Sequence, residues 1–125
     1  MQRRIKLTSG SLHAEAVLYA SPTADAVWNC LPLHTSVHTW GDEIYFSIPV
    51  QVDLEPEAKK VVEMGDMGYW PSGAAFCIFF GPTPVSRPGE IRPASAVNVF
   101  GKVTGATEDF KKIAEGKSIS IEKVP

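Results

Sequence analysis

Cysteine and histidine are scarce in this sequence, which holds two cysteines and three histidines among 125 residues. Cys30 and Cys77 lie far apart in apolar surroundings, so we expect reduced thiols packed as small apolar side chains rather than a disulfide or a metal pair. His13 completes no ligand spacing, and His34 and His38 would lie about 13 Å apart along one strand. The sequence therefore predicts no metal site.

Long hydrophobic runs are missing as well. The longest apolar stretch, residues 74–80, is too short to cross a bilayer as a helix. Residues 1–7 carry positive charge but lack the apolar stretch that a secretory signal peptide needs. We therefore expect a cytoplasmic protein that makes no contact with membranes.

Positive charge is not in excess, because the sequence has 12 basic and 14 acidic residues and a net charge of -2. A protein that holds a phosphate backbone usually presents a basic face, so nucleic acid is not an expected partner. The sequence also lacks a phosphate-binding loop, a dinucleotide fingerprint and a Gly-x-Ser-x-Gly motif. We expect no cofactor, and the residues alone point to no catalytic group.

Glycine and proline are abundant, with ten residues each, as a domain of short strands and turns requires. The length suits one domain spanning residues 1–125. Residues 65–84 organise the chain, because they hold two turn signals, an aromatic cluster and the apolar run of residues 74–80. Glycine and proline bound this run on both sides, which predicts a strand buried on both faces.

Alternating apolar residues predict about eight strands. They cover residues 3–8, 11–19, 34–40, 43–48, 67–70, 74–80, 96–103 and 118–124. Ser9–Gly10 and Gly41–Asp42 supply tight hairpin turns. Residues 53–63 fit an irregular loop or one helical turn, and residues 61–66 fit a further short strand that runs into a turn.

Two capped segments predict short helices near residues 22–31 and 107–115. Strands and helices do not alternate regularly, so the sheet should be antiparallel. An antiparallel sheet of this size in so short a chain is expected to close, because closure removes exposed edge strands. The sequence predicts an all-β fold, a closed antiparallel eight-stranded barrel with two short helices at its open ends.

Four segments of the chain resemble a known family. They are residues 40–47 (WGDEIYFS), 65–71 (GDMGYWP), 79–84 (FFGPTP) and 92–99 (RPASAVNV). Together, and in this order, they look like the small bacterial and archaeal cyclophilin-like family of uncharacterised proteins, over nearly the whole chain. The resemblance implies a cyclophilin-like fold, an eight-stranded closed barrel with a helix at each end.

The resemblance does not extend to prolyl isomerase chemistry. True cyclophilins act through an arginine in a Phe-His-Arg run that a Gln-Gly-Gly-Asp run follows, and neither run occurs here. Arg87 and Arg92 lie in a Pro-rich loop, residues 81–93, and not on a predicted strand.

We therefore expect a non-enzymatic protein that binds a small ligand or a Pro-containing peptide. The alternative is a peptidyl-prolyl isomerase, or another enzyme that uses an aromatic groove, and it rests on fold analogy alone. Nothing in the sequence specifies an oligomeric state.

A ligand site should lie on the outer face or at an end of the barrel, because a small barrel fills its interior with side chains. Large amphipathic rings border flexible chain at two turns, and the loop of residues 81–93 is long and rich in proline. We predict one groove formed by Trp40, Glu43, Tyr69, Trp70, Thr83 and Arg92. The rings would supply apolar contact, and the two charged residues would set its polarity. Packing of the rings in the core is the alternative.

Two acidic residues, Glu43 and Asp66, adjoin aromatic side chains. Such a setting can raise a carboxyl pKa and produce a general acid or base. Both residues also sit at tight turns, where carboxylates commonly accept local hydrogen bonds. The turn explanation is the stronger for Asp66, whereas for Glu43, which would project from a strand, both explanations stay open.

Overall fold

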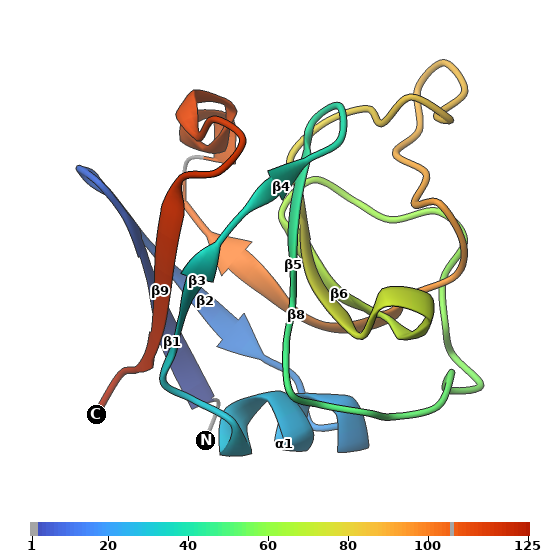
Figure 1. Ribbon diagram of the computed structural model, residues 1–125. Helices are drawn as coiled ribbons and strands as arrows, with labels where there is room; N and C mark the ends of the chain where they lie inside the picture. The colour runs from blue at the N-terminus through green and yellow to red at the C-terminus, as the bar shows by residue number, and fades with distance from the viewer. Residues whose placement is uncertain (1–2, 106) are drawn as a thin grey trace.

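The computed structural model describes residues 3–105 and 107–125 and shows a nearly closed antiparallel barrel (Figure 1). The elements follow in chain order: β1 (Arg3–Ser9), β2 (Leu12–Leu18), α1 (Pro22–Asn29), β3 (Leu33–Ser36), β4 (His38–Thr39), β5 (Glu43–Ser47), β6 (Asp66–Trp70), η1 (Pro71–Gly73), β7 (Ala75–Phe79), β8 (Asn98–Thr104), η2 (Thr107–Lys112) and β9 (Ser118–Lys123). The predicted all-β barrel with two short helices is confirmed, with nine strands in place of eight.

The sheet comes close to closing because one short segment pairs with β9 at one end of the sheet and with β5 at the other. The strand order is β3-β9-β1-β2-β8-β6-β7-β5-β4, so β3 and β4, which are consecutive in the chain, lie at its opposite ends. Val37, between them, donates its backbone N–H to the Lys117 carbonyl and accepts from the Gly116 N–H, both at 2.9 Å. The change of partner splits the single strand predicted for residues 34–40 into two, which accounts for the ninth strand.

Two glycines make the tight turns that join neighbouring strands. Gly10, between β1 and β2, has a φ of 60°, and Gly41, between β4 and β5, has a φ of 59°. Both lie in the left-handed region that glycine adopts without steric cost, as short hairpin loops require. Around Gly41 the Trp40 N–H donates to the Glu43 carbonyl at 2.9 Å, so these two residues stand side by side at the start of β5.

Aromatic rings fill the interior of the barrel. Phe76 on β7 stacks on Phe46 with ring centroids 5.0 Å apart and meets Phe100 edge to face at 4.9 Å. Both geometries are favoured by the quadrupoles of the rings. The next residue along β7, Cys77, lies in a second apolar cluster on the outer side of this wall, as strand periodicity predicts.

A capped helix covers one end of the barrel, α1 in Figure 1. The Ser21 hydroxyl accepts from the Ala24 N–H at 3.1 Å, and Pro22 occupies the first helical turn, as the sequence predicted. The helix ends at Asn29, two residues before the predicted end. Among the described residues no helix is long and apolar enough to span a membrane.

The second predicted helix is a shorter 3₁₀ element. It covers Thr107–Lys112 and not residues 107–115, and the Ile113 N–H donates to the Phe110 carbonyl three residues earlier at 3.0 Å. This tight winding directs Phe110 into the barrel, where its ring stacks on Phe80 at 5.9 Å. Burial of one large ring holds the element in place at the end opposite α1 (Figure 1).

Two long loops without regular structure, one between β5 and β6 and the other between β7 and β8, cover the outer face of β6 and β7. Isolated bridges join the two loops and pair Lys59 with Val97 and Val62 with Ile91. The Lys59 N–H donates to the Val97 carbonyl at 2.8 Å, and the Val97 N–H donates in return at 3.0 Å. The short strand predicted for residues 61–66 is therefore wrong, because this part of the chain forms only a single bridge to another loop, at Val62.

A buried polar network fixes the first of these segments to the barrel. The Asn98 amide donates to the Thr23 hydroxyl at 3.1 Å and to the Asp53 carbonyl at 2.9 Å, and it accepts from the Glu55 N–H at 2.7 Å. The Glu55 carboxylate in turn accepts from the Thr23 hydroxyl and backbone N–H. These bonds connect α1, β8 and the loop after β5, so the loop has a defined path over the barrel.

Barrel closure at Val37 gives a prediction for stability. Val37 is fully buried, whereas Val61 is 40% exposed. We expect Val37→Ala to lower the free energy of unfolding by about 2 kcal/mol, because it removes two buried methyl groups and leaves a small cavity. The same change at Val61 should alter it by less than about 0.5 kcal/mol. Urea unfolding followed by circular dichroism measures both, and equal effects would contradict a closing role for Val37.

Candidate functional site

A pocket of about 170 Å³ lies on the outer side of the barrel wall. It is lined by rings, one carboxyl, one thiol and small apolar groups: Trp40, Glu43, Tyr45, Trp70, Cys77, Pro93, Ala94 and Val97. The first three come from the β4–β5 hairpin, the next two from β6 and β7, and the last three from the loop before β8. Three stretches that are distant in the sequence therefore build one concave site.

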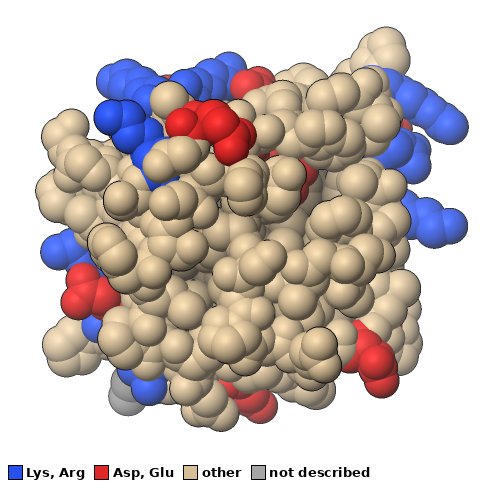
Figure 2. All heavy atoms as spheres, viewed as in Figure 1, with Lys and Arg blue, Asp and Glu red and all other residues tan. Residues whose placement is uncertain are grey.

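Strand geometry explains why these side chains meet. Glu43 and Tyr45 are two residues apart on β5, so they point to the same face of the sheet. Cys77 stands directly opposite Tyr45 on β7, and Glu43 stands opposite Phe79. The residues between them, such as Ile44, point into the barrel. The face of the molecule in front of β5 carries few charged side chains, which gather along its edges (Figure 2).

The aromatic walls of the pocket are held in place by specific contacts. The Trp70 indole N–H donates to the Ser95 hydroxyl at 2.6 Å. A Cβ atom on Gly73 would lie 2.9 Å from two atoms of the Trp70 ring, so the indole packs directly on this glycine. The Tyr45 ring lies against His38, with centroids 5.3 Å apart. The two rings therefore form fixed surfaces.

Glu43 is the acidic group of the pocket and is only 5% exposed. Burial raises its pKa from 4.5 to about 7, and a hydrogen bond from the Cys77 thiol opposes the rise only in part. The pKa of Cys77 is raised well above its usual value by burial and by the neighbouring carboxyl. At neutral pH the pocket thus combines a neutral thiol with a carboxyl that can gain or lose a proton.

This arrangement can recognise a ligand in two ways. Its rings and small apolar groups can surround an apolar body, and the Glu43 carboxyl can accept a hydrogen bond or face a positive charge. The Trp70 N–H is already occupied by Ser95. The Cys77 thiol is a weak donor. Glu43 is therefore the group that gives the pocket its polarity.

The structure brings together three of the six residues predicted for the groove. Trp40, Glu43 and Trp70 line the same pocket. Tyr69 does not join them, which corrects the prediction: its ring is buried in the barrel interior, and its hydroxyl donates to the Val50 carbonyl at 2.6 Å. Neighbouring residues of a strand face opposite sides, so Tyr69 and Trp70 separate.

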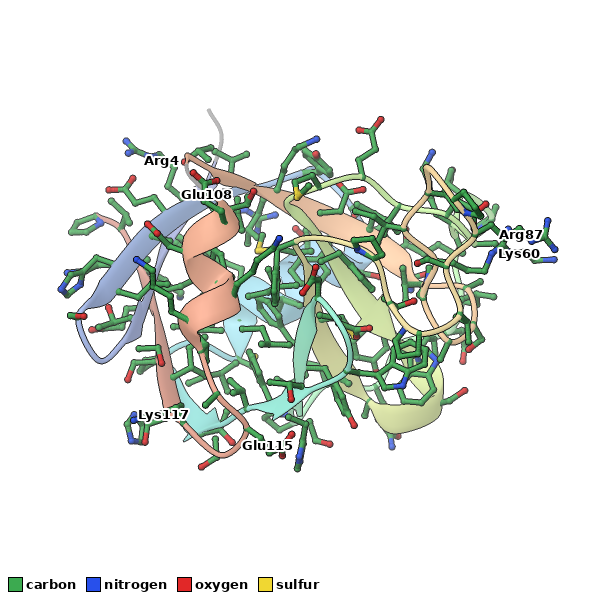
Figure 3. All side chains as sticks on the ribbon, turned by 90° about the horizontal axis from the view of Figure 1, so that it is seen from above. Arg4, Lys60, Arg87, Glu108, Glu115 and Lys117 are labelled. Carbon is green, nitrogen blue, oxygen red and sulfur yellow. The ribbon has the colours of Figure 1, made fainter. Side chains whose placement is uncertain are left out.

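Thr83 and Arg92 also lie outside the pocket lining. The Thr83 hydroxyl donates to the Arg92 carbonyl, and its N–H donates to the Ser86 hydroxyl at 2.9 Å, so Thr83 stabilises its own loop. The Arg92 guanidinium pairs with Glu90 at 2.6 Å. Arg87, on the same loop, projects outward (Figure 3). The Pro-rich loop thus supplies a wall through its later residues and not through Thr83 or Arg92.

Five lining residues were missing from the predicted site: Tyr45, Cys77, Pro93, Ala94 and Val97. Strand periodicity could have identified Tyr45, because it shares the face of Glu43. It could also have placed Cys77 outside the barrel once Phe76 was assigned to the interior. The three loop residues carry no such signal, since their position depends on the bridges to Lys59 and Val62.

Asp66, the second acid considered, behaves as a turn residue. Its carboxylate accepts from the Glu63 N–H at 2.8 Å and lies 3.9 Å from the Lys102 ammonium. Burial raises its pKa, while the Glu63 N–H and Lys102 lower it. Asp66 does not line the pocket, so the explanation from local hydrogen bonding fits its geometry.

The histidines have separate partners. His34 bonds to the Ser120 hydroxyl at 2.7 Å, and His38 bonds to the Glu115 carboxylate at 2.9 Å. Within residues 3–105 and 107–125, no three His, Cys, Asp or Glu side chains gather in a way that could hold a metal ion.

The raised pKa of Glu43 gives a prediction for stability against pH. A carboxyl whose pKa is higher in the folded state binds its proton more tightly there, so the contribution of Glu43 to stability is fully present below about pH 4.5 and is lost as the pH rises to about 7. In the wild type this loss should lower the free energy of unfolding by about 3 kcal/mol across this pH range, and we expect Glu43→Gln to abolish the loss. The control Glu57→Gln, at an exposed position, should show the same loss as the wild type. Urea unfolding at several pH values measures the difference, and parallel curves for wild type and Glu43→Gln would contradict the assignment.

Comparison with known proteins agrees with the fold. Residues 3–122 match the family model described as cyclophilin-like. The chain is similar to the hypothetical protein AF2241 from Archaeoglobus fulgidus, with 42% identity over 98% of this chain and 95% of that one and a TM-score of 0.83. It is also similar to McbB, solved in complex with tryptophan, with 11% identity and a TM-score of 0.71. That match covers 94% of this chain but 44% of McbB, so it shows the fold alone.

No curated protein sequence matches the chain. The implied relationship is thereby confirmed, and the chain belongs to the cyclophilin-like family.

Proposed function

We propose that this protein binds a compact, largely apolar group of a small molecule in the pocket between Trp40 and Trp70, without converting it chemically. The size and lining of the pocket carry the proposal. A dry apolar cavity of about 150 Å³ accepts a benzene molecule. A pocket of about 170 Å³ with an apolar lining has room for one ring or one branched alkyl group.

The pocket also limits how much of a ligand it can enclose. Sites that bury a whole drug-sized molecule are typically about 300–1,000 Å³. Here one group would be enclosed while the rest of the ligand lies outside, near the exposed Ala94 and Ser95. A proline ring has a suitable size, so a Pro-containing peptide is tested beside small molecules. The complex of McbB with tryptophan supports the proposal in that a protein sharing this fold over part of its length binds a molecule with a ring.

The positions of the arginines favour binding over prolyl isomerisation. Catalysis would need a group that stabilises the twisted prolyl amide more than the planar one. The Arg92 guanidinium is engaged with Glu90, and Arg87 points outward (Figure 3). Neither belongs to the lining of the pocket.

Nuclear magnetic resonance can test the binding proposal with benzyl alcohol and an N-acetylproline amide as probes. The protein has three tryptophans, so three indole N–H signals report separately. We expect saturable shifts for Trp40 and Trp70 with a Kd of about 1 mM, or roughly -4 kcal/mol, for at least one probe. Trp28 is an internal control, because its ring on α1 lies beside Arg3 and Lys123 instead.

A pair of matched variants locates the binding. Ala94→Leu narrows the pocket and should weaken binding about tenfold, a loss of about 1.4 kcal/mol. Ala114→Leu makes the same change at another exposed alanine, after η2, and should leave it unchanged. If both probes leave Trp40 and Trp70 unmoved, or if the two variants weaken binding equally, the proposed function is wrong.

Absence of isomerase activity is a separate expectation. Uncatalysed X-Pro exchange takes tens to hundreds of seconds, so catalysis is readily detected. We expect catalytic amounts of the protein to leave the exchange rate of an Ala-Pro peptide unchanged in a magnetisation-exchange measurement. Acceleration of about tenfold or more, worth about 1.4 kcal/mol in the barrier, would favour the isomerase alternative.

A further inference from the structure

We infer that the pocket takes a small alkylated ammonium cation, with Glu43 facing its charge and the rings of Trp40, Tyr45 and Trp70 surrounding its alkyl groups. The inference rests on the proposed function, because it names the ligand class of the same pocket. Its basis is the combination of one buried carboxyl and three aromatic rings in one cavity.

The aromatic lining suits a cation as well as an apolar group. Three of the eight lining residues are Trp or Tyr. The negative faces of such rings attract ammonium groups, most strongly for Trp and where water is excluded. Alkylated ammonium ions are the ligands that aromatic cages bind best, because they combine charge with an apolar surface that is only weakly hydrated.

The carboxyl distinguishes a cation from a neutral occupant. Glu43 is only 5% exposed in the free protein, and a neutral group above it would remove the remaining contact with water. Burial of a carboxylate without a partner is costly, whereas an opposite charge offsets the cost. Among the described residues, Glu43 is the one acidic or basic residue of the lining, so an opposite charge for its ionised form would come from the ligand.

Two charged groups that adjoin the lining are already paired. Asp42, the neighbour of Glu43, lies 3.8 Å from the Lys111 ammonium. Arg92, beside the lining residue Pro93, pairs with Glu90 at 2.6 Å. No lysine or arginine lines the pocket formed by the described residues. The carboxyl is thus left to a ligand.

Size is consistent with this class of ligand. A trimethylammonium group is comparable in volume with benzene, which a cavity of about 150 Å³ accepts. The pocket of about 170 Å³ therefore has room for it. The remaining chain of such a ligand would extend past Ala94, which is exposed.

Choline and 3,3-dimethylbutan-1-ol test the inference, because they have nearly the same shape and differ in charge. Binding to the full chain is followed through the indole signals of Trp40 and Trp70 at about pH 7.5. We expect choline to bind about tenfold more tightly than the alcohol. Glu43→Gln should remove this preference, while Glu57→Gln, at an exposed position, should keep it.

The pH dependence gives a second readout that needs no variant. Choline pairs with the ionised carboxyl, so its affinity should rise between about pH 5.5 and pH 8.5, whereas that of the alcohol should not. The other titratable groups of the lining are Tyr45 on β5 and Cys77 on β7. His38, which lies against Tyr45 and bonds to Glu115, is a further titratable group beside the pocket. The Glu43→Gln variant retains all of these other groups. If its affinity for choline no longer rises with pH, the pH dependence belongs to Glu43.

The outcomes separate the inference from the proposed function. If the alcohol binds as tightly as choline or more tightly, and the indole signals of Trp40 and Trp70 shift, the ligand is not an alkylated ammonium ion. The proposal that the pocket binds a ligand is then unaffected. A choline affinity that does not change with pH in the wild type overturns the role of Glu43, even if Glu43→Gln fails to fold. If neither compound moves the two indole signals, and the probes of the proposed function also fail, the pocket itself is not a binding site.

Discussion

Backbone pairing of residues 33–39 with two different partners is the constraint on which the barrel depends. β3 pairs with β9 and β4 pairs with β5, so one segment joins the two ends of the sheet. The two ends of the sheet are thereby brought together within one continuous segment, with Val37 buried at the change of partner. The hairpin that follows carries Trp40 and Glu43, which places one wall of the pocket next to the point of closure.

The pocket exists because β5 and β7 are covered on both faces, by the core on the inner face and by loops on the outer face. Phe46 and Phe76 pack inside the barrel, while Tyr45 and Cys77 face outward beneath the loops. The two loops are tied to each other by single bridges and not by a continuous ladder, so their cover is incomplete. Rigid strands therefore present the polar group, and a loop closes the cavity around it.

Strand periodicity predicted most of the barrel and only part of the site. Alternation along β7 separates Phe76, which packs in the barrel interior, from Cys77, which faces outward, because neighbouring residues of a strand point to opposite faces. The same alternation places Tyr69 and Trp70 on opposite faces of β6. The prediction that both line one groove did not take this alternation into account. The split of residues 34–40 and the wall formed by Pro93–Val97 depend on pairing between distant segments, which periodicity does not specify.

The energetics of Glu43 connect the free protein to its proposed ligand. Desolvation raises the pKa of this carboxyl to about 7 because the surroundings solvate its charge poorly. The same surroundings screen an approaching cation poorly, so its attraction to the carboxylate is stronger than it would be in water. A cost of about 3 kcal/mol for the ionised form is tolerable in a domain stabilised by about 5–15 kcal/mol. A bound cation lowers the pKa and recovers part of that cost, so the destabilisation of the empty pocket and the affinity for a cation share one physical origin.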